Sequence, residues 1–246
     1  MNAQFLKFSQ ALVLAAGVIT ASLAMADAPP RDPAQPDVVS VPLANAYIPD
    51  GFDSKNRVRM MVEGFFPSTC YRIREAQVDA TDTSIGVTQT AFKYNGPCLW
   101  MMVSYSQPVN VGILKASAYT VKDSFSGRVL GALPVAAAKE KIGPDDYFYA
   151  NVKDAFVGNI DGGARTFVVN GVLPGDCWKL KEKRVFIDGK NVITILPIAE
   201  KTEGPNCKDV ETPFVTMVDI PSVPAGRYML HVRSLNGESI MKLIDL

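Results

Sequence analysis

The stretch Val169–Lys179, VNGVLPGDCWK, repeats a phrase that the chain has already used at Val62–Arg72, VEGFFPSTCYR. In both copies Val, Gly, Pro and Cys stand at matching places, and each Cys is followed by an aromatic residue and a base. The copies lie 107 residues apart, and the register continues beyond them to set Ile85 against Val192. The chain therefore reads as a tandem duplication of a unit of roughly 100 residues.

The four cysteines of the chain are divided equally between the two units. Four cysteines allow three pairings, and their number alone does not choose among them. After a two-residue insertion in the second copy the offset becomes 109, which sets Cys98 against Cys207. The duplication therefore predicts one disulfide in each unit, Cys70 with Cys98 and Cys177 with Cys207. Each bridge should stabilise its unit by roughly 3–4 kcal/mol on the chain-entropy model.

Hydrophobic residues within each unit recur with the period of two that is typical of strands. In the last strand Tyr228, Leu230 and Val232 face inward, and Met229, His231 and Arg233 face outward. Near the first Cys, Met60 and Phe167 take equivalent core positions. The dipeptide Asp188-Gly189 between two β-rich runs predicts a two-residue hairpin turn.

Short strands, frequent Pro and Gly and the length of each unit predict an all-β fold. We expect two tandem antiparallel β-sandwich domains, immunoglobulin-like or fibronectin-III-like, each with one internal disulfide, and a closed barrel is the alternative. The predicted segments are a signal peptide at 1–26, a Pro-rich leader at 27–40, domain 1 at 41–132, a linker at 133–146 with a helical turn at 136–141, and domain 2 at 147–246.

The N-terminus has the features of a cleaved signal peptide. Lys7 is its only charge, an apolar run follows from Ala11 to Ala24, and Ala24-Met25-Ala26 before Asp27 has the small-x-small form of a cleavage site. A membrane-spanning helix needs about 20 apolar residues, and this run is shorter. Its length therefore disfavours an uncleaved membrane anchor. We therefore expect a periplasmic or extracellular protein with no membrane span after cleavage.

The charge balance bears on the class of partner. The chain carries 25 basic and 25 acidic residues, so its formal net charge is zero. A neutral chain has no long-range field that would gather nucleic acid or an anionic membrane. We expect neither as a partner.

The repeated motif resembles a disulfide-containing, Ig-like domain of exported bacterial proteins, a family often without an assigned activity. Its pattern is G-x-x-P-x-x-C, a later Cys, and then G-x-Y-x-Φ-x-Φ before Asn-Gly. The motif residues here are Gly64, Pro67, Cys70, Cys98 and Tyr119 in the first unit, and Gly171, Pro174, Cys177, Cys207, Gly226, Tyr228, Asn236 and Gly237 in the second. The first unit lacks the Gly before its Tyr. The resemblance implies a fold and no chemistry.

Catalytic motifs are weak in this sequence. His231, the only histidine, falls on the outward side of a strand, where a solvated side chain is expected, and no G-x-S-x-G phrase accompanies it. The nearest carboxylate pairs are Asp145-Asp146 and Asp79 with Asp82, and turn positions explain them better than glycoside hydrolysis. We therefore expect no enzyme and no cofactor.

Metal binding is the next class of site to consider. The pairs Met60-Met61 and Met101-Met102 offer thioethers that suit Cu(I). Neighbouring residues on a strand face opposite sides, so neither pair chelates one ion, and Met60 and Met101 match Phe167 and Val210 as core residues. Asp50, Asp53 and Asp161 lie in no EF-hand-like loop that would hold calcium. We expect no metal site.

Basic residues follow the first Cys of each unit and alternate onto the outward face of a strand. Edge strands use such residues against aggregation. They also suit an acidic glycan or protein partner, because Arg pairs bidentately with carboxylate or phosphate. Exposed Met61 and Trp100 could add an apolar contact. The predicted binding ridge consists of Arg72, Arg74, Lys179, Lys181 and Lys183.

These observations together predict an exported, non-enzymatic binding protein that recognises a macromolecular partner, a protein or an acidic glycan of the envelope. The alternative is a periplasmic protein that binds a small ligand or copper. A histidine-independent hydrolase is the third possibility.

Overall fold

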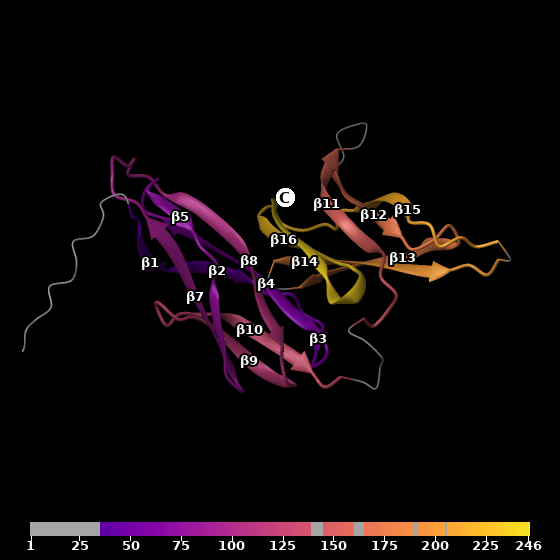
Figure 1. Ribbon diagram of the computed structural model, residues 1–246, viewed down its shortest axis with the longest axis horizontal. Helices are drawn as coiled ribbons and strands as arrows, with labels where there is room; N and C mark the ends of the chain where they lie inside the picture. The colour runs from indigo at the N-terminus through magenta and orange to yellow at the C-terminus, as the bar shows by residue number, and fades with distance from the viewer. Residues whose placement is uncertain (1–34, 139–144, 160–164, 189–190, 205) are drawn as a thin grey trace, which may run out of the picture. The chain divides into compact units, whose positions relative to one another are not determined.

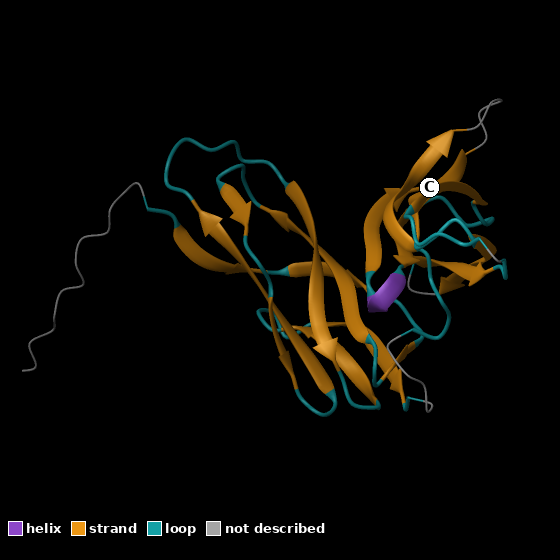
Figure 2. Ribbon diagram, turned by 45° about the vertical axis from the view of Figure 1, so that its right-hand side comes forward, coloured by secondary structure: helices purple, strands orange, loops and turns teal. Residues whose placement is uncertain are grey.

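A computed structural model of the protein describes residues 35–138, 145–159, 165–188, 191–204 and 206–246 (Figure 1). In these residues the only helical element is a single 3-10 turn, η1 (Leu235–Gly237), and almost all regular structure is β (Figure 2). The all-β prediction is confirmed. The described residues form one compact unit. The predicted signal peptide and the leader up to residue 34 lie outside the described residues.

Ten strands in residues 35–138, called here the first half, form two sheets around one core. One sheet has the order β2-β4-β8, and the other has the order β1-β7-β9-β10-β3, with β5 and β6 also paired to β7. Val58, Met60 and Val62 are fully buried between them. The strands are β1 (Asp37–Val41), β2 (Leu43–Tyr47), β3 (Phe52–Asp53), β4 (Arg57–Phe66), β5 (Tyr71–Ile73), β6 (Gln77–Ala80), β7 (Ser84–Lys93), β8 (Val103–Ile113), β9 (Ser117–Asp123) and β10 (Val129–Ala136).

Seven strands in residues 145–246, the second half, enclose a separate core. The sheets have the orders β11-β12-β15 and β13-β14-β16-β17. Phe167 is fully buried at the position that matches Met60, as predicted, and Leu230 and Val232 face the same core. The strands are β11 (Asn151–Asn159), β12 (Arg165–Leu173), β13 (Trp178–Asp188), β14 (Val192–Lys201), β15 (Thr212–Asp219), β16 (Arg227–Arg233) and β17 (Ser239–Asp245).

The strand topology repeats between the halves, as the sequence duplication predicts. The sheet β2-β4-β8 corresponds to β11-β12-β15, and β7-β9-β10 corresponds to β14-β16-β17. In both halves the first pair of the latter set is parallel and the second is antiparallel. The division into two independent domains at the expected boundaries stays a prediction.

The hairpin between β13 and β14 corrects two details of the sequence alignment. Ile85 pairs with Val121, and Ile193 pairs with Leu230, so Ile85 corresponds to Ile193 rather than to Val192. One inserted residue therefore already falls in this hairpin. Asp188, which was expected in a two-residue turn, is instead the last residue of β13 and pairs with Val192, and residues 189–190 lie outside the described residues.

A tyrosine hydroxyl fixes the entry to the equivalent strands β9 and β16. Tyr119 donates to the carbonyl oxygen of Lys115 at 3.0 Å, and Tyr228 donates to that of Pro224 at 2.9 Å. A tyrosine hydroxyl that returns to the backbone a few residues upstream is typical of immunoglobulin-type sandwiches. The repeated bond explains physically why both units keep this Tyr.

Both predicted disulfides are present, and no cysteine is free. The Cα atoms of Cys70 and Cys98 lie 5.5 Å apart, and those of Cys177 and Cys207 lie 5.4 Å apart. Each bridge joins the segment after β4 or β12 to the segment after β7 or β14. Two structural disulfides indicate an oxidising, periplasmic or extracellular environment.

Two predicted segment limits differ from the strands. Residues 37–40 of the expected leader belong to β1, which pairs with β7. Residues 133–136 of the expected linker belong to β10, so Ala136 is in a strand and not at the start of a helical turn. The remainder of that turn, from residue 139, lies outside the described residues.

Removing the second disulfide should destabilise the second half. We expect Cys177→Ala with Cys207→Ala to lower the free energy of unfolding by about 2–4 kcal/mol. Without the bridge, the unfolded chain has more conformational entropy than the cross-linked one. In a Trp100→Phe background, Trp178 is the only tryptophan, and urea unfolding followed by its fluorescence measures the change. An unchanged urea midpoint would contradict this role. The matched variant is Cys70→Ala with Cys98→Ala, which removes the equivalent bridge of the first half.

Candidate functional site

The segment Leu99–Met102, called here the apolar loop, exposes four consecutive hydrophobic side chains. Their exposed fractions are 69% for Leu99, 88% for Trp100, 52% for Met101 and 67% for Met102. Exposure of such a run to water does not stabilise the fold. Exposed apolar runs of this length mark interaction sites. The prediction that Trp100 is exposed is confirmed. Met101, which we expected in the core, is exposed instead, as is its counterpart Val210.

The apolar loop is anchored at its start. The disulfide holds Cys98 to Cys70. Next to it, the backbone amide of Thr69 donates to the carbonyl oxygen of Leu99, and the amide of Leu99 donates to Thr69 Oγ1, both at 3.1 Å. These bonds fix the backbone from which Trp100 projects. A fixed backbone lowers the entropy that binding costs.

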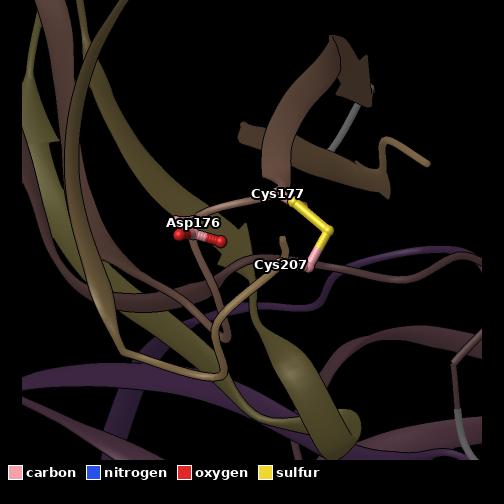
Figure 3. A group of neighbouring side chains, drawn as sticks. All are labelled: Asp176, Cys177 and Cys207. Atoms are coloured by element: carbon pink, nitrogen blue, oxygen red, sulfur yellow. A yellow bond between two sulfur atoms is a disulfide. The ribbon is translucent and has the colours of Figure 1, made fainter. Parts of the chain in front are cut away.

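The equivalent segment of the second half is held similarly but has a different surface. Asp176 lies beside the bridge between Cys177 and Cys207 (Figure 3). Its backbone amide donates to the carbonyl oxygen of Lys208 at 3.2 Å, and its Oδ1 accepts the amide of Lys208 at 2.8 Å. The side chains that follow Cys207 are Lys, Asp, Val and Glu, so Asp209 stands where the first half has Trp100. The fold therefore does not require the apolar loop to be apolar.

Within the described residues, Asp176, Cys177 and Cys207 are the one group that the geometry brings together as potential metal ligands. The two sulfurs are bonded to each other, and the carboxylate holds Lys208. Neither sulfur is a thiolate, which is the form that binds metal. This group is part of the loop anchor rather than a metal site.

Methionines and acidic residues that we considered as metal ligands are dispersed. Met60 is fully buried in the first core, and Met61, expected to be exposed, is 5% exposed against the second half. Asp53 Oδ1 accepts the backbone amide of Lys55 at 2.8 Å, as a turn residue does. Asp50 lines the cavity described below, and Asp161 lies outside the described residues.

The predicted binding ridge lies on edge strands but does not form one face. In the second half, β13 is the last strand of its sheet, and in the first half β5 pairs only with β7 among the described strands. A bulge between Leu180 and Glu182 reverses the alternation. Lys183 consequently leaves the face of Lys179, and its Nζ donates to the carbonyl oxygen of Met217 at 2.9 Å.

Internal partners occupy most of these bases. Lys179 and Lys181 both contact Glu200, with N–O distances of 3.6 and 2.9 Å. The guanidinium of Arg74 lies 4.8 Å from the ring centroid of Phe92, whereas Arg72 is exposed. Positive charge that is already paired on an edge strand fits protection against aggregation better than recognition of an acidic ligand.

His231 is on the outward face of β16, as predicted, but it is 2% exposed rather than solvated. Its Nδ1 lies 3.2 Å from Thr194 Oγ1. Burial lowers the pKa of His231 from its ordinary value of 6.5 to about 3, and the nearby charges of Arg233 and Arg59 act in the same direction. The imidazole is therefore neutral at physiological pH.

A cavity of about 420 Å³ adjoins His231. Its polar lining includes Arg233, which is 9% exposed and whose Nε has no hydrogen-bond partner in the described part of the chain. All lining residues except Asp50 and Gly51 belong to the second half. This volume is within the range of small-molecule sites, which are mostly apolar with a few polar groups. The apolar wall consists of Tyr147, Tyr149, Phe186, Ile187 and Leu196.

The carboxylates that we considered for catalysis have structural partners. Asp145 accepts the backbone amides of Asn236 and Gly237 at 2.7 and 2.9 Å and lies 3.6 Å from Arg233. Its neighbour Asp146 lines the cavity. Asp79 and Asp82 are exposed, and Asp82 contacts Lys115. Hydrogen bonds to a turn account for the partial burial of Asp145.

Comparison of this chain with known families, with curated proteins and with solved structures finds no match. In the part of the chain that the structure describes, no helix has the length and apolar character needed to cross a membrane.

Burial of His231 makes stability depend on pH. Below pH 6.5 His231 becomes protonated in the unfolded chain, whereas in the folded protein it becomes protonated only near pH 3. The free energy of unfolding should therefore fall as the pH falls through this window, by at most about 1.4 kcal/mol per pH unit from this residue. Urea unfolding of the native protein and of His231→Gln between these pH values isolates the contribution. Parallel pH profiles would show that His231 is not buried in neutral form.

Proposed function

We propose that this is an exported, non-enzymatic binding protein that docks a protein partner of the cell envelope through its apolar loop. The observation that carries the proposal is the run of four exposed hydrophobic side chains beside the bridge of Cys70 and Cys98. Burial of Trp100 in a pocket of the partner would remove its apolar surface from water, and tryptophan is enriched among residues that dominate interface energies.

Export supports the choice of compartment. The small-x-small site before Asp27 is the expected cleavage point, and both disulfides suit an oxidising space. The tandem domains are proposed to be relatives of the Ig-like units of exported bacterial proteins.

The apolar loop supports a protein partner better than an acidic glycan. Leu99, Trp100, Met101 and Met102 offer no charge for a carboxylate or sulfate, and the bases Lys179 and Lys181 already contact Glu200. A complementary surface with an apolar pocket is the chemistry that this loop fits.

Site-specific photocrosslinking in the exporting cell tests the proposal. A photoreactive phenylalanine analogue at Trp100 should yield one defined crosslinked species, because the side chain would lie within a partner's pocket. The matched control is the same substitution at Asp209, the equivalent position of the second half, which should yield none. Crosslinking at neither position, or equally at both, would contradict docking by the apolar loop.

A second variant separates the apolar loop from the basic residues. Replacing Leu99–Met102 by the Lys-Asp-Val-Glu of the second half should abolish crosslinking from a reporter at the exposed neighbour Tyr94. Reversing the charges of Arg72, Arg74, Lys179, Lys181 and Lys183 to Glu should leave it intact. The opposite pattern would assign the contact to the bases.

The cavity beside His231 favours a second candidate function, the binding of a small apolar ligand. Tyr147, Phe186 and Leu196 supply an apolar wall, and the neutral imidazole of His231 and the guanidinium of Arg233 supply polar groups beside it. Such a combination is the usual composition of ligand pockets. This function would coexist with docking, since the apolar loop lies in the other half.

Filling the cavity tests this candidate. The probe is 1-anilinonaphthalene-8-sulfonate, whose fluorescence rises in apolar sites, and we expect saturable binding by the native protein. Leu196→Trp should weaken binding at least about tenfold, because the larger side chain occupies the cavity. Binding of equal strength in this variant, with an unchanged melting temperature, would contradict a ligand site here.

A further inference from the structure

The guanidinium of Arg233, in the wall of the cavity beside His231, has incomplete hydrogen bonding. Its side chain is 10% exposed and lies on β16, two residues after His231 and on the same side of the strand. Within the described residues its Nε has no hydrogen-bond partner. Its ion pair with Asp145 is 3.6 Å long, which is too long for a hydrogen bond. A buried charged donor without an acceptor is costly, so this group requires an explanation.

The described neighbours of Arg233 do not supply the acceptor. Its guanidinium lies 5.5 Å from the ring centroid of Tyr149, whose face attracts a cation without completing its hydrogen bonds. Asp145 is held in place by the backbone amides of Asn236 and Gly237, which it accepts at 2.7 and 2.9 Å. An acceptor for Arg233 would therefore come from a molecule in the cavity.

The wall beside Arg233 suits an apolar molecule. Tyr147, Phe186 and Leu196 line the cavity, whose volume of about 420 Å³ is large enough for a small organic ligand. The imidazole of His231 is neutral at physiological pH, because burial lowers its pKa to about 3. Most of a ligand's surface would thus meet uncharged groups.

The charges around the cavity favour an acceptor that is itself uncharged. Besides Arg233, the charged residues that the structure describes in the lining are Asp50, Asp146 and Asp188. Their carboxylates would repel an anion, and Asp145 already offsets the charge of Arg233. A cation would be repelled by Arg233 and would bring no acceptor to it. A neutral oxygen, as in a ketone, ester or amide, avoids both penalties.

We propose that the cavity binds an uncharged apolar molecule whose carbonyl oxygen accepts a hydrogen bond from the guanidinium of Arg233. This inference rests on the proposed ligand site and adds the chemical class of the ligand to it. The apolar body of the ligand packs against Tyr147, Phe186 and Leu196. Its oxygen supplies the acceptor that Arg233 lacks among the described residues.

Competition between two ligands of similar shape tests the role of the carbonyl. Benzophenone and diphenylmethane differ only at the bridging carbon, which is a carbonyl in the first and a methylene in the second. The reporter that they displace is 1-anilinonaphthalene, an uncharged dye whose fluorescence rises in apolar sites. Arg233→Met should lower the affinity for benzophenone relative to diphenylmethane at least about tenfold, because a hydrogen bond from a charged donor is lost. The ratio cancels changes of the cavity that affect both ligands equally.

Arg184→Met is the matched control. The guanidinium of Arg184 lies 4.9 Å from the ring centroid of Tyr147, but its Nε already donates to Glu182 at 2.8 Å. This variant should therefore keep the native affinity ratio. The Leu196→Trp variant, in which the cavity is filled, identifies the part of the dye signal that comes from the cavity.

A measurement on the native protein makes the test independent of how Arg233→Met folds. A hydrogen bond weakens the C=O bond of the ligand, so the infrared carbonyl stretch of bound benzophenone should lie at lower frequency than in hexane. In the Arg184→Met variant the stretch should stay at the frequency of the native complex.

Failure of this inference is distinguishable from failure of the ligand site. Without saturable binding of 1-anilinonaphthalene in the cavity, the ligand site itself would be wrong. If the dye binds there, an unchanged affinity ratio in Arg233→Met or a carbonyl stretch at the hexane frequency would overturn the role of Arg233 alone. Tighter binding of 1-anilinonaphthalene-8-sulfonate than of its uncharged parent would assign the cavity to an anion instead.

Discussion

The disulfide between Cys70 and Cys98, repeated between Cys177 and Cys207, is the constraint that anchors the exposed loop after the second Cys of each half. Each bridge joins the chain after a strand of one sheet to the chain after a strand of the other. A unit of this size has a small core, so a covalent closure supplies a large share of its stability. Because the closure fixes the segment that follows the second Cys, that segment can vary in sequence without loss of the fold.

A comparison of the two duplicated halves distinguishes positions that the fold requires from outer positions that can differ. Equivalent core positions such as Met60 and Phe167 stay apolar in both halves, because each core must exclude water. Outer positions differ between the halves: Asp209 replaces Trp100, and Tyr47 is buried whereas its counterpart Phe156 is exposed. Since both halves have the same topology, these differences are free to serve different contacts.

Most of the fold could be predicted, whereas much of the candidate site could not. Strand periodicity and the repeated motif were sufficient for the all-β class and both disulfides, because these depend on local alternation and on the spacing of Cys. The bulge in β13 was not predicted, because the amino-acid sequence around Leu180 is compatible with both a bulge and regular alternation. It moved Lys183 to another face and divided the predicted ridge.

His231 and Met61 mark the boundary between sequence and tertiary structure. The sequence by itself determined which side of its strand each residue occupies, because alternation is a property of the backbone. Whether that side meets water depended on what packs against it, and packing between distant segments leaves no local pattern. Only the tertiary structure therefore decided that Met61 and His231 are buried and that Phe156 and Met217 remain open, although all four face outward from their own sheets.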